Sequence, residues 1–481
     1  WSAGGTVDFK VLILGLDDSV VSDVNTTIDF VETRVPVFWT LPVRNNFSDN
    51  TFTTVQNSQI DPLEQLLLRA APVDDIVFVR RPLINVNNVT TSADMKRALK
   101  IYDQLTILAW NMGLAQNGVP PFDLPEQITG FNATGFGNAG GSSDRVGNGG
   151  DGRITWVSAA NYAMTYGHEI NHNIDRSSPG SWGLHSRGCN AQSGGALDTS
   201  WPYGSDWTIQ ETGVFQTTNG AFMSMNDQTP DLMSYCLAGT NPDSWWSPYR
   251  WQAWIDELKS ATPGGDSAPQ TSADRAVAGA ASGAGVLAVP EDSFYVLGNV
   301  YPDGSGEFSQ VLRQPGTPDP EGLVGEYRVR VLGCADQTLA ENRFPVSFLG
   351  DEGEDDPLFT FSFVLPAAPE SCRIELLLND VVLDSRTISD HAPTVTVVAP
   401  NGGENWSGRQ VVRWTADDAD SDPLQFTLLY STDNGVTWEV IAAMIDGYAQ
   451  EVDFDLLQGS ESALIRVLAS DSGNTGEDDS D

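Results

Sequence analysis

His168-Glu169-Ile170-Asn171-His172 lies inside a segment, Ala159–Asn173, whose hydrophobic pattern predicts a helix. On a helix, residues four apart differ by about 40° around the axis, so both imidazoles project from one face. Two neutral imidazoles at that spacing can bind one zinc ion. The stretch therefore predicts a metal-binding helix. The alternative is a helix whose histidines only make ordinary polar contacts.

The residue after the first histidine suggests what such a metal would do. Glu169 lies about 100° around the helix from His168, so it is poorly placed to join the same coordination but can reach a nearby water molecule. Zinc lowers the pKa of bound water towards about 7, and a carboxylate can then take its proton. The same carboxylate can return that proton to a leaving amine. The pattern predicts hydrolysis, with Glu169 as general base and then general acid.

A catalytic zinc needs a third protein ligand and one open position. The best candidate is His185, which follows His172 after a segment that contains Pro179, Gly180 and Gly183 and can turn the chain back. The remaining candidates are acidic residues downstream of the helix: Asp175, Asp198 and Glu211.

Further along the chain is Asp231-Leu232-Met233-Ser234-Tyr235-Cys236. Together with the histidine helix and His185-Ser-Arg-Gly-Cys189, this stretch resembles the metzincin clan of zinc metallopeptidases, and within it the secreted bacterial members. The resemblance covers residues 150–260 well and residues 1–150 in outline. It implies a turn at Met233 that places a soft apolar floor beneath the metal, and a Tyr235 that assists at the metal or the oxyanion.

The sequence departs from that pattern between the second and third ligands. Asp175 stands where the clan has a turning glycine, and the path to His185 is longer than usual. Either the extra residues loop out and His185 remains the ligand, or an acidic residue replaces it. Ligation by Asp175 would resemble aspartate-zinc peptidases, and ligation by Glu211 would resemble the glutamate-zinc group. Arg153–Ser158 is expected to be the edge strand beside the cleft, where a peptide could add by backbone pairing.

The chain has four cysteines, an even number that suits disulfides and an oxidising compartment. Three pairings are open. We favour Cys189–Cys236 and Cys334–Cys372, because each pair then stays inside one expected domain. The alternative is four buried thiols.

The composition excludes several classes of partner. The chain of 481 residues has 25 basic and 65 acidic side chains, a formal charge of −40, which argues against nucleic acid and anionic membrane surfaces. No apolar run approaches the 20 or so residues of a membrane helix. Only four of the basic residues are lysines, which suits a salt-rich environment. An ordinary acidic secreted protein explains the balance equally well.

The order of patterns predicts a multidomain protein: an α+β, metzincin-like catalytic domain at 1–262, a linker at 263–285, and two all-β sandwiches at 286–391 and 392–481. A long helix is expected at Ala93–Leu114. The sandwiches are predicted from short strands at Phe294–Val300, Glu326–Leu332, Phe344–Leu349, Leu358–Leu365, Arg373–Leu378, Thr394–Ala399, Gln410–Thr415, Leu424–Ser431, Thr437–Ala443 and Ala463–Ala469. Asn434-Gly435 predicts a type I′ hairpin.

The accessory half carries two further features. Asp418, Asp420 and Asp422 alternate along one loop and could bind calcium, although acidic loops are commonly only solvated turns. Pro400–Trp406 resembles immunoglobulin-like or fibronectin-like modules of secreted bacterial proteins, which implies a spacer, an adhesion unit or self-assembly. Tryptophans gather at 245–254, where core packing and sugar stacking are the two interpretations.

These patterns favour a secreted or cell-surface zinc endopeptidase acting on protein or glycoprotein, with His168, His172 and His185 as ligands. The alternative from another class is an extracellular structural or adhesion protein, catalytically silent or with secondary activity, built on a metallopeptidase-like domain and acidic sandwiches. A third hypothesis is a peptidase that recognises the glycan of its substrate.

Overall fold

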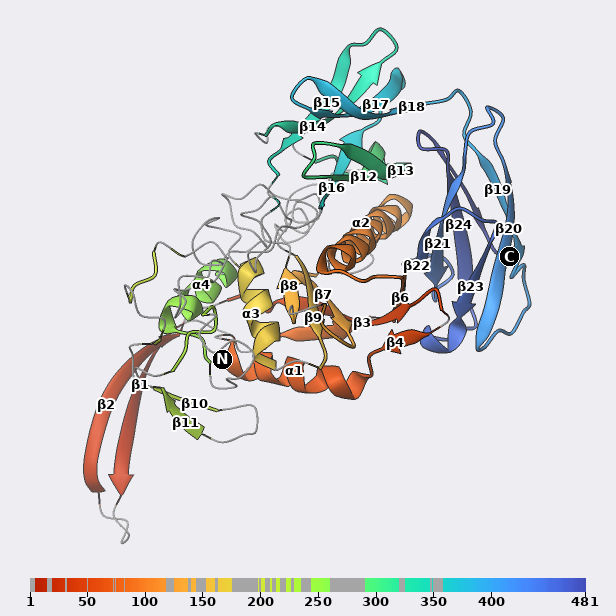
Figure 1. Cartoon of the computed structure of the whole chain (residues 1–481). Coiled ribbons are helices and arrows are strands. Elements are labelled where there is room, and N and C mark those ends of the chain that lie inside the picture. The colour runs from red at the N-terminus through yellow and green to blue at the C-terminus, as the bar shows by residue number, and fades with distance from the viewer. Residues whose placement is uncertain are drawn as a thin grey trace.

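The computed structural model describes residues 5–14, 20–30, 33–49, 51–71, 73, 75–81, 83–117, 125–136, 140–143, 153–160, 163–174, 198, 200–203, 208–209, 213–216, 222–225, 229–234, 244–259, 290–319, 325–346, 348 and 358–481. These residues form a β-rich, multidomain architecture with four α-helices, as Figure 1 shows. The expected linker at 263–285 lies outside the described residues, and the boundaries drawn around it remain predictions.

A seven-stranded sheet organises the N-terminal part, with the main order β4-β3-β7-β9-β8 and with β5 and β6 both pairing with β3. The pairings of β3 with β5, β6 and β7, and of β7 with β9, are parallel. Those of β4 and β8 are antiparallel. The strands are β3 (Val37–Asn46), β4 (Phe52–Thr54), β5 (Val77–Arg80), β6 (Ile84–Asn87), β7 (Gln127–Asn132), β8 (Gly141–Ser143) and β9 (Ile154–Ser158).

Helices cover both faces of this sheet, because alternate strand residues point to opposite sides. Phe131 and Val157 share a core with α1 (Asn57–Ala70), α3 (Ala163–Ile174) and α4 (Pro248–Leu258). Ile154 and Trp156 point the other way and pack against α2 (Ser92–Asn117). Figure 1 shows α1 and α2 on opposite sides of the sheet. The sheet is therefore buried on two faces, which suits its parallel pairs.

The expected edge strand was misplaced. Residues 154–158 form β9, which has β7 on one side and β8 on the other. Among the described strands, the edge position belongs to the three-residue β8. Its residues, Gly141-Ser142-Ser143, have no hydrophobic alternation, so no local pattern indicates a strand there.

Two hairpins accompany this domain. β1 (Gly5–Leu14) pairs antiparallel with β2 (Val20–Phe30), and Figure 1 shows the pair extending away from the sheet. β10 (Gly213–Gln216) pairs antiparallel with β11 (Phe222–Met225).

The first β-sandwich is confirmed as two facing sheets, ordered β13-β12-β16 and β15-β14-β17-β18. Its core holds a group of phenylalanines, in which Phe344 lies 5.0 Å from Phe361 between ring centroids. The strand predicted at Phe344–Leu349 is wrong, because β15 ends at Phe344. The strands are β12 (Glu291–Val300), β13 (Gly306–Gly316), β14 (Tyr327–Gly333), β15 (Thr338–Phe344), β16 (Phe359–Pro366), β17 (Ser371–Leu378) and β18 (Val381–Thr387).

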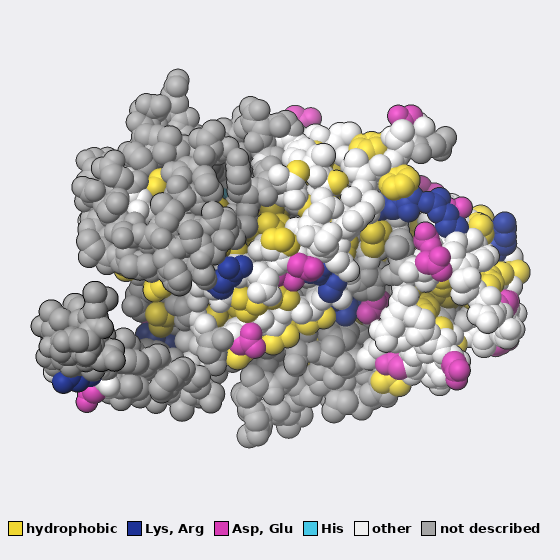
Figure 2. All heavy atoms as spheres, turned by 90° about the horizontal axis from the view of Figure 1, so that it is seen from below, with side chains coloured by type: hydrophobic (Ala, Val, Ile, Leu, Met, Phe, Trp, Pro, Cys, Tyr) yellow, Lys and Arg dark blue, Asp and Glu magenta, His cyan; other side chains and the backbone are white. Residues whose placement is uncertain are grey.

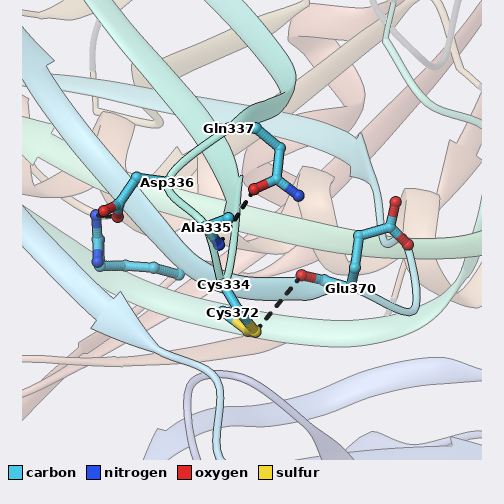
Figure 3. The surroundings of a disulfide bond; sticks show 7 residues. Cys334, Ala335, Asp336, Gln337, Glu370 and Cys372 are labelled. Carbon is cyan, nitrogen blue, oxygen red and sulfur yellow. Dashed lines mark hydrogen bonds and ion pairs between the residues drawn. A yellow bond between two sulfur atoms is a disulfide. The ribbon is translucent and has the colours of Figure 1, made fainter.

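A disulfide joins Cys334 and Cys372 in this sandwich, which confirms one of the two favoured pairs. Figure 3 shows it at the end of the sheet, beside the turn of residues 335–337 that connects β14 to β15. Because it closes a loop of 38 residues, it should stabilise the fold by about 4 kcal/mol in the chain-entropy picture. Cys189 and Cys236 lie outside the described residues.

The second β-sandwich also has two sheets, ordered β19-β20-β23 and β22-β21-β24-β25. Asn434 and Gly435 have φ values of 60° and 80°, as a type I′ turn requires, but they lie within a longer connection between β21 and β22. The strands are β19 (Thr394–Ala399), β20 (Arg409–Asp417), β21 (Gln425–Ser431), β22 (Glu439–Ile445), β23 (Ala449–Asp453), β24 (Leu464–Ser470) and β25 (Thr475–Asp479), and Phe454–Leu456 forms a short 3₁₀ helix.

Helix α2 packs against the N-terminal sheet and against both sandwiches. Leu99 packs against the N-terminal sheet, whereas Leu105 and Leu108 share a cluster with residues of both sandwiches. That cluster contains Tyr295, Leu297, Leu312 and Val364 from the first sandwich and Leu429, Trp438 and Leu468 from the second. Figure 1 shows α2 lying between the sheet and the two sandwiches. A helix that is apolar on most sides is expected to be enclosed in this way.

None of the described helices is long and apolar enough to cross a bilayer. On the face shown in Figure 2, basic and acidic side chains are dispersed over the described part of the surface.

Candidate metal centre

The two histidines of α3 face the same point. Their Nε2 atoms lie 3.1 Å apart, and their ring planes meet at 80°. His172 is only 2% exposed, and His168 is partly buried. The predicted spacing of one helical turn therefore brings the two imidazoles together as expected.

A backbone carbonyl orients the first imidazole. His168 Nδ1 lies 2.8 Å from the carbonyl oxygen of Leu232, the residue before Met233. A carbonyl can only accept a hydrogen bond, so Nδ1 carries the proton and the Nε2 of a neutral ring keeps its lone pair. The lone pair that a metal requires is thus directed at His172. Carbonyl or carboxylate partners of this kind are typical of metal-ligating histidines.

The separation of the two nitrogens is close to that of two ligands of one tetrahedral ion. Zinc–nitrogen distances of about 2.0–2.1 Å at tetrahedral angles place two imidazole nitrogens about 3.3–3.4 Å apart. The observed 3.1 Å is slightly shorter, so a small opening of the pair would admit the ion. Borderline-soft nitrogen donors suit zinc better than calcium or magnesium, which prefer oxygen ligands.

Glu169 lies beside this pair, under the edge strand. It is 2% exposed, and a Cβ atom on Gly141 of β8 would stand 2.6 Å from its Cγ atom. Only a glycine at this position leaves room for the carboxylate. This proximity of Gly141 to Glu169 has no local signal in the sequence.

Two asparagines that the motif analysis missed anchor α3 on both sides of His172. Asn171 Oδ1 accepts a hydrogen bond from Trp254 Nε1 of α4 at 3.2 Å. Asn173 Nδ2 lies within 3.0 Å of three acceptors, namely Gln127 Oε1, Ile154 O and Thr155 Oγ1, so it joins α3 to β7 and β9. Both asparagines are fully buried. The helix is therefore held by polar contacts as well as by its apolar residues.

The tryptophan group after the turn packs in the core. Trp245, Trp246 and Trp254 are at most 3% exposed and share one cluster with α1 and α3. The Trp246 ring lies so close to Gly167 that a Cβ atom there would be 2.4 Å away. Ser247 caps α4 with Pro248 at the first turn. Within this group only Trp251 is exposed, so core packing is the interpretation that its burial supports.

Met233 occupies a buried turn next to Leu232, the residue whose carbonyl oxygen contacts His168. It is fully buried, and its backbone N–H donates to the carboxylate of Asp231 at 3.1 Å. The Ser234 N–H donates to the Asp231 carbonyl at 2.9 Å and closes the turn. The Leu232 N–H donates to the Trp245 carbonyl, and the Trp245 N–H donates to the Pro230 carbonyl, which fixes the turn relative to the start of α4.

Of the three acidic candidates for the third ligand, Asp198 is described, and it has another partner. Its Oδ2 lies 3.1 Å from Nη1 of Arg250, and both side chains are fully buried. Burial raises the pKa of Asp198, although Arg250 counteracts this. An ion pair of this kind favours a structural role for Asp198. His185, Asp175, Glu211 and Tyr235 lie outside the described residues.

The acidic loop predicted to bind calcium also comes together. One carboxylate oxygen each of Asp418, Asp420 and Asp422 lies within 4.8 Å of the others. Asp418 accepts the N–H groups of Asp420 and Asp422, and Asp420 accepts both N–H and Nδ1 of His391. These hydrogen bonds already give the loop a structural role at the junction of the two sandwiches. Calcium there stays a prediction.

A scan against protein-family models finds no match for this chain, and a search of curated proteins finds no relative. What the centre can do is therefore argued from its own geometry.

Proposed function

We propose that the chain is a secreted zinc-dependent endopeptidase whose described metal ligands are His168 and His172. The observation that carries the proposal is the 3.1 Å approach of their Nε2 atoms, with the His168 Nδ1 proton directed to Leu232. His185 is the proposed third ligand, because it is the remaining imidazole near the motif and Asp198 is paired with Arg250.

Glu169 is the proposed proton carrier. Zinc, when bound, acidifies water and polarises the carbonyl of the scissile bond. The Glu169 carboxylate accepts the proton of the attacking water and then delivers it to the leaving nitrogen. Gly141 leaves space for that carboxylate, and β8 offers an edge to which an extended substrate could add by backbone hydrogen bonds. Tyr235 is proposed to assist, as the metzincin resemblance implies.

The disulfide between Cys334 and Cys372 supports an extracellular location, because such bonds persist in oxidising compartments. The large negative charge agrees with a protein exposed to solvent and salt.

Metal content and one isosteric substitution test the proposal. The full chain should copurify with about one zinc per molecule and should cleave an unstructured protein substrate. Glu169→Gln should retain zinc and lose hydrolysis by about 100-fold or more. Glu451→Gln, an exposed position in the second sandwich, should retain both and serves as the control.

Full hydrolysis by Glu169→Gln would contradict the proton-carrier role. A chain that binds no zinc and cleaves nothing would instead favour the structural or adhesion alternative. Faster cleavage of a glycosylated substrate than of the bare one would favour the glycan-directed form of the peptidase.

A further inference from the structure

A buried polar connection runs from α4 to the first metal ligand. The Leu232 carbonyl that accepts His168 Nδ1 belongs to a turn, and Asp231 shapes that turn twice. Its carboxylate accepts the Met233 N–H at 3.1 Å, and its carbonyl accepts the Ser234 N–H at 2.9 Å. The direction of the Leu232 carbonyl therefore depends on the conformation of Asp231.

Arg250 of α4 lies against that carboxylate. Its Nε atom is 3.6 Å from Asp231 Oδ2, and its Nη1 atom is 3.1 Å from Asp198 Oδ2. All three side chains are fully buried. The guanidinium also lies 5.3 Å from the centroid of the Trp201 ring. A carboxylate in such a place is costly to move, because rotation would separate two buried opposite charges.

We propose that Asp231, held by Arg250, is a positioning residue for His168: it directs the Leu232 carbonyl and so selects the Nδ1–H tautomer that leaves Nε2 available to the metal. This inference rests on the zinc site proposed above and assigns a role to residues that touch neither metal nor substrate. A displaced carbonyl would release the ring, and a neutral imidazole could then carry its proton on Nε2, where it cannot bind zinc.

Asp198 provides a matched control within the same ion-pair group. It gives Arg250 an equally buried carboxylate, but its Oδ1 accepts the Ser200 N–H, which lies outside the turn. Asp231→Asn and Asp198→Asn each remove one charge from the same guanidinium. If Asp231, Asp198 and Arg250 had only a structural role, the two variants would change zinc binding to the same extent.

The experiment compares these variants in the full chain by competition with a chromophoric zinc chelator, by the visible absorption of the Co²⁺-loaded protein, and by urea unfolding of the metal-free protein. We expect Asp231→Asn to weaken zinc binding by about 10-fold and to alter the Co²⁺ spectrum, with a loss of up to about 100-fold for Asp231→Ala. Asp198→Asn should lower the unfolding midpoint yet keep zinc affinity and spectrum.

Equal zinc affinities for the two Asn variants, with unchanged Co²⁺ spectra, would overturn the positioning role while wild-type zinc binding still upheld the function. A wild type without zinc affinity would refute the proposed function itself. If the variants fail to fold, the tautomer of His168 in the metal-free wild type tests the proposal instead. The chain has four histidines, so ¹⁵N-imidazole spectra can be assigned. An Nε2–H tautomer at His168 would then overturn the proposal.

Discussion

Gly141 and Glu169 stand so close that a Cβ atom on the glycine would be 2.6 Å from Cγ of the glutamate and 2.9 Å from its Oε1. The edge strand β8 and helix α3 thus meet at the residue that the proposed mechanism needs to move a proton. This contact ties the position of a possible substrate strand to the position of the general base.

Gly141→Ala should lower the rate of peptide hydrolysis by about 10- to 100-fold with zinc still bound, because Glu169 must move away from its present position. The measurement is kcat with zinc content determined in parallel. Gly447→Ala is the control, since a Cβ atom there meets nothing within 4 Å. Equal kcat values for the two variants would contradict the tight contact.

Asn173 is expected to be essential for docking of helix α3 against the sheet. Asn173→Asp replaces a donor that serves three acceptors by a carboxylate facing the same acceptors in a buried site. Asn173→Ala should cost about 1–3 kcal/mol, and Asn173→Asp more, because a buried charge would be left facing acceptors.

Urea unfolding of the metal-free chain measures both changes. Gln450, whose amide donates to a carbonyl on the exposed surface of the second sandwich, supplies the control substitution Gln450→Ala. A smaller loss for Asn173→Asp than for Asn173→Ala would show that the donor is not what holds the helix.

The elements that sequence analysis located are those with a local signal. The helix at α3 follows from spacing within one segment, and the cap of α4 follows from Ser247 and Pro248. The sheet order has no such signal: β8 is Gly-Ser-Ser, and β25 is Thr-Gly-Glu-Asp-Asp, whose acidic composition is not typical of a strand.

The supports of the candidate site were missed for a related reason. Arg250 and Asp231 are separated by many residues, and only tertiary structure brings Arg250 between Asp231 and Asp198. Likewise, the periodicity of α2 predicted a helix but not which surfaces would cover it. Its apolar residues on several sides were the one indication that it is enclosed.

The enclosure of α2 predicts that the sandwiches and the N-terminal domain resist unfolding together. Leu108 is fully buried and lines a small space with Tyr295, Leu297 and Leu312 of the first sandwich. Leu108→Ala should cost about 2–5 kcal/mol through lost burial and a cavity. If the domains form one cooperative unit, amide hydrogen exchange should also accelerate in α3, which Leu108 does not belong to.

Hydrogen exchange read by mass spectrometry separates the outcomes. Val381→Ala, at a position 65% exposed in β18, is the control and should leave exchange in α3 unchanged. Faster exchange confined to the sandwiches in Leu108→Ala would mean that the accessory half unfolds independently of the N-terminal domain.

The junction of the two sandwiches should weaken as pH rises above neutrality. His391 Nδ1 lies 2.9 Å from Asp420 Oδ1, and this hydrogen bond raises the pKa of His391 and lowers that of Asp420, with Asp390 and Asp418 adding to the effect on the histidine. A raised histidine pKa contributes stability below its unfolded value of about 6.5, and this is lost as pH rises through the folded pKa. An aspartate whose pKa is lowered on folding contributes stability above its unfolded value of about 3.9, and this stability is lost as pH falls through the folded pKa.

The pair should therefore stabilise most between about pH 4 and 6.5. The urea midpoint of the wild type should exceed that of His391→Asn at pH 5.5, and the difference should shrink by pH 8.5. His391→Asn keeps the backbone N–H that donates to Asp420, so the comparison isolates the imidazole. A difference that stays constant across this range would show that the ionised imidazole adds nothing to the junction.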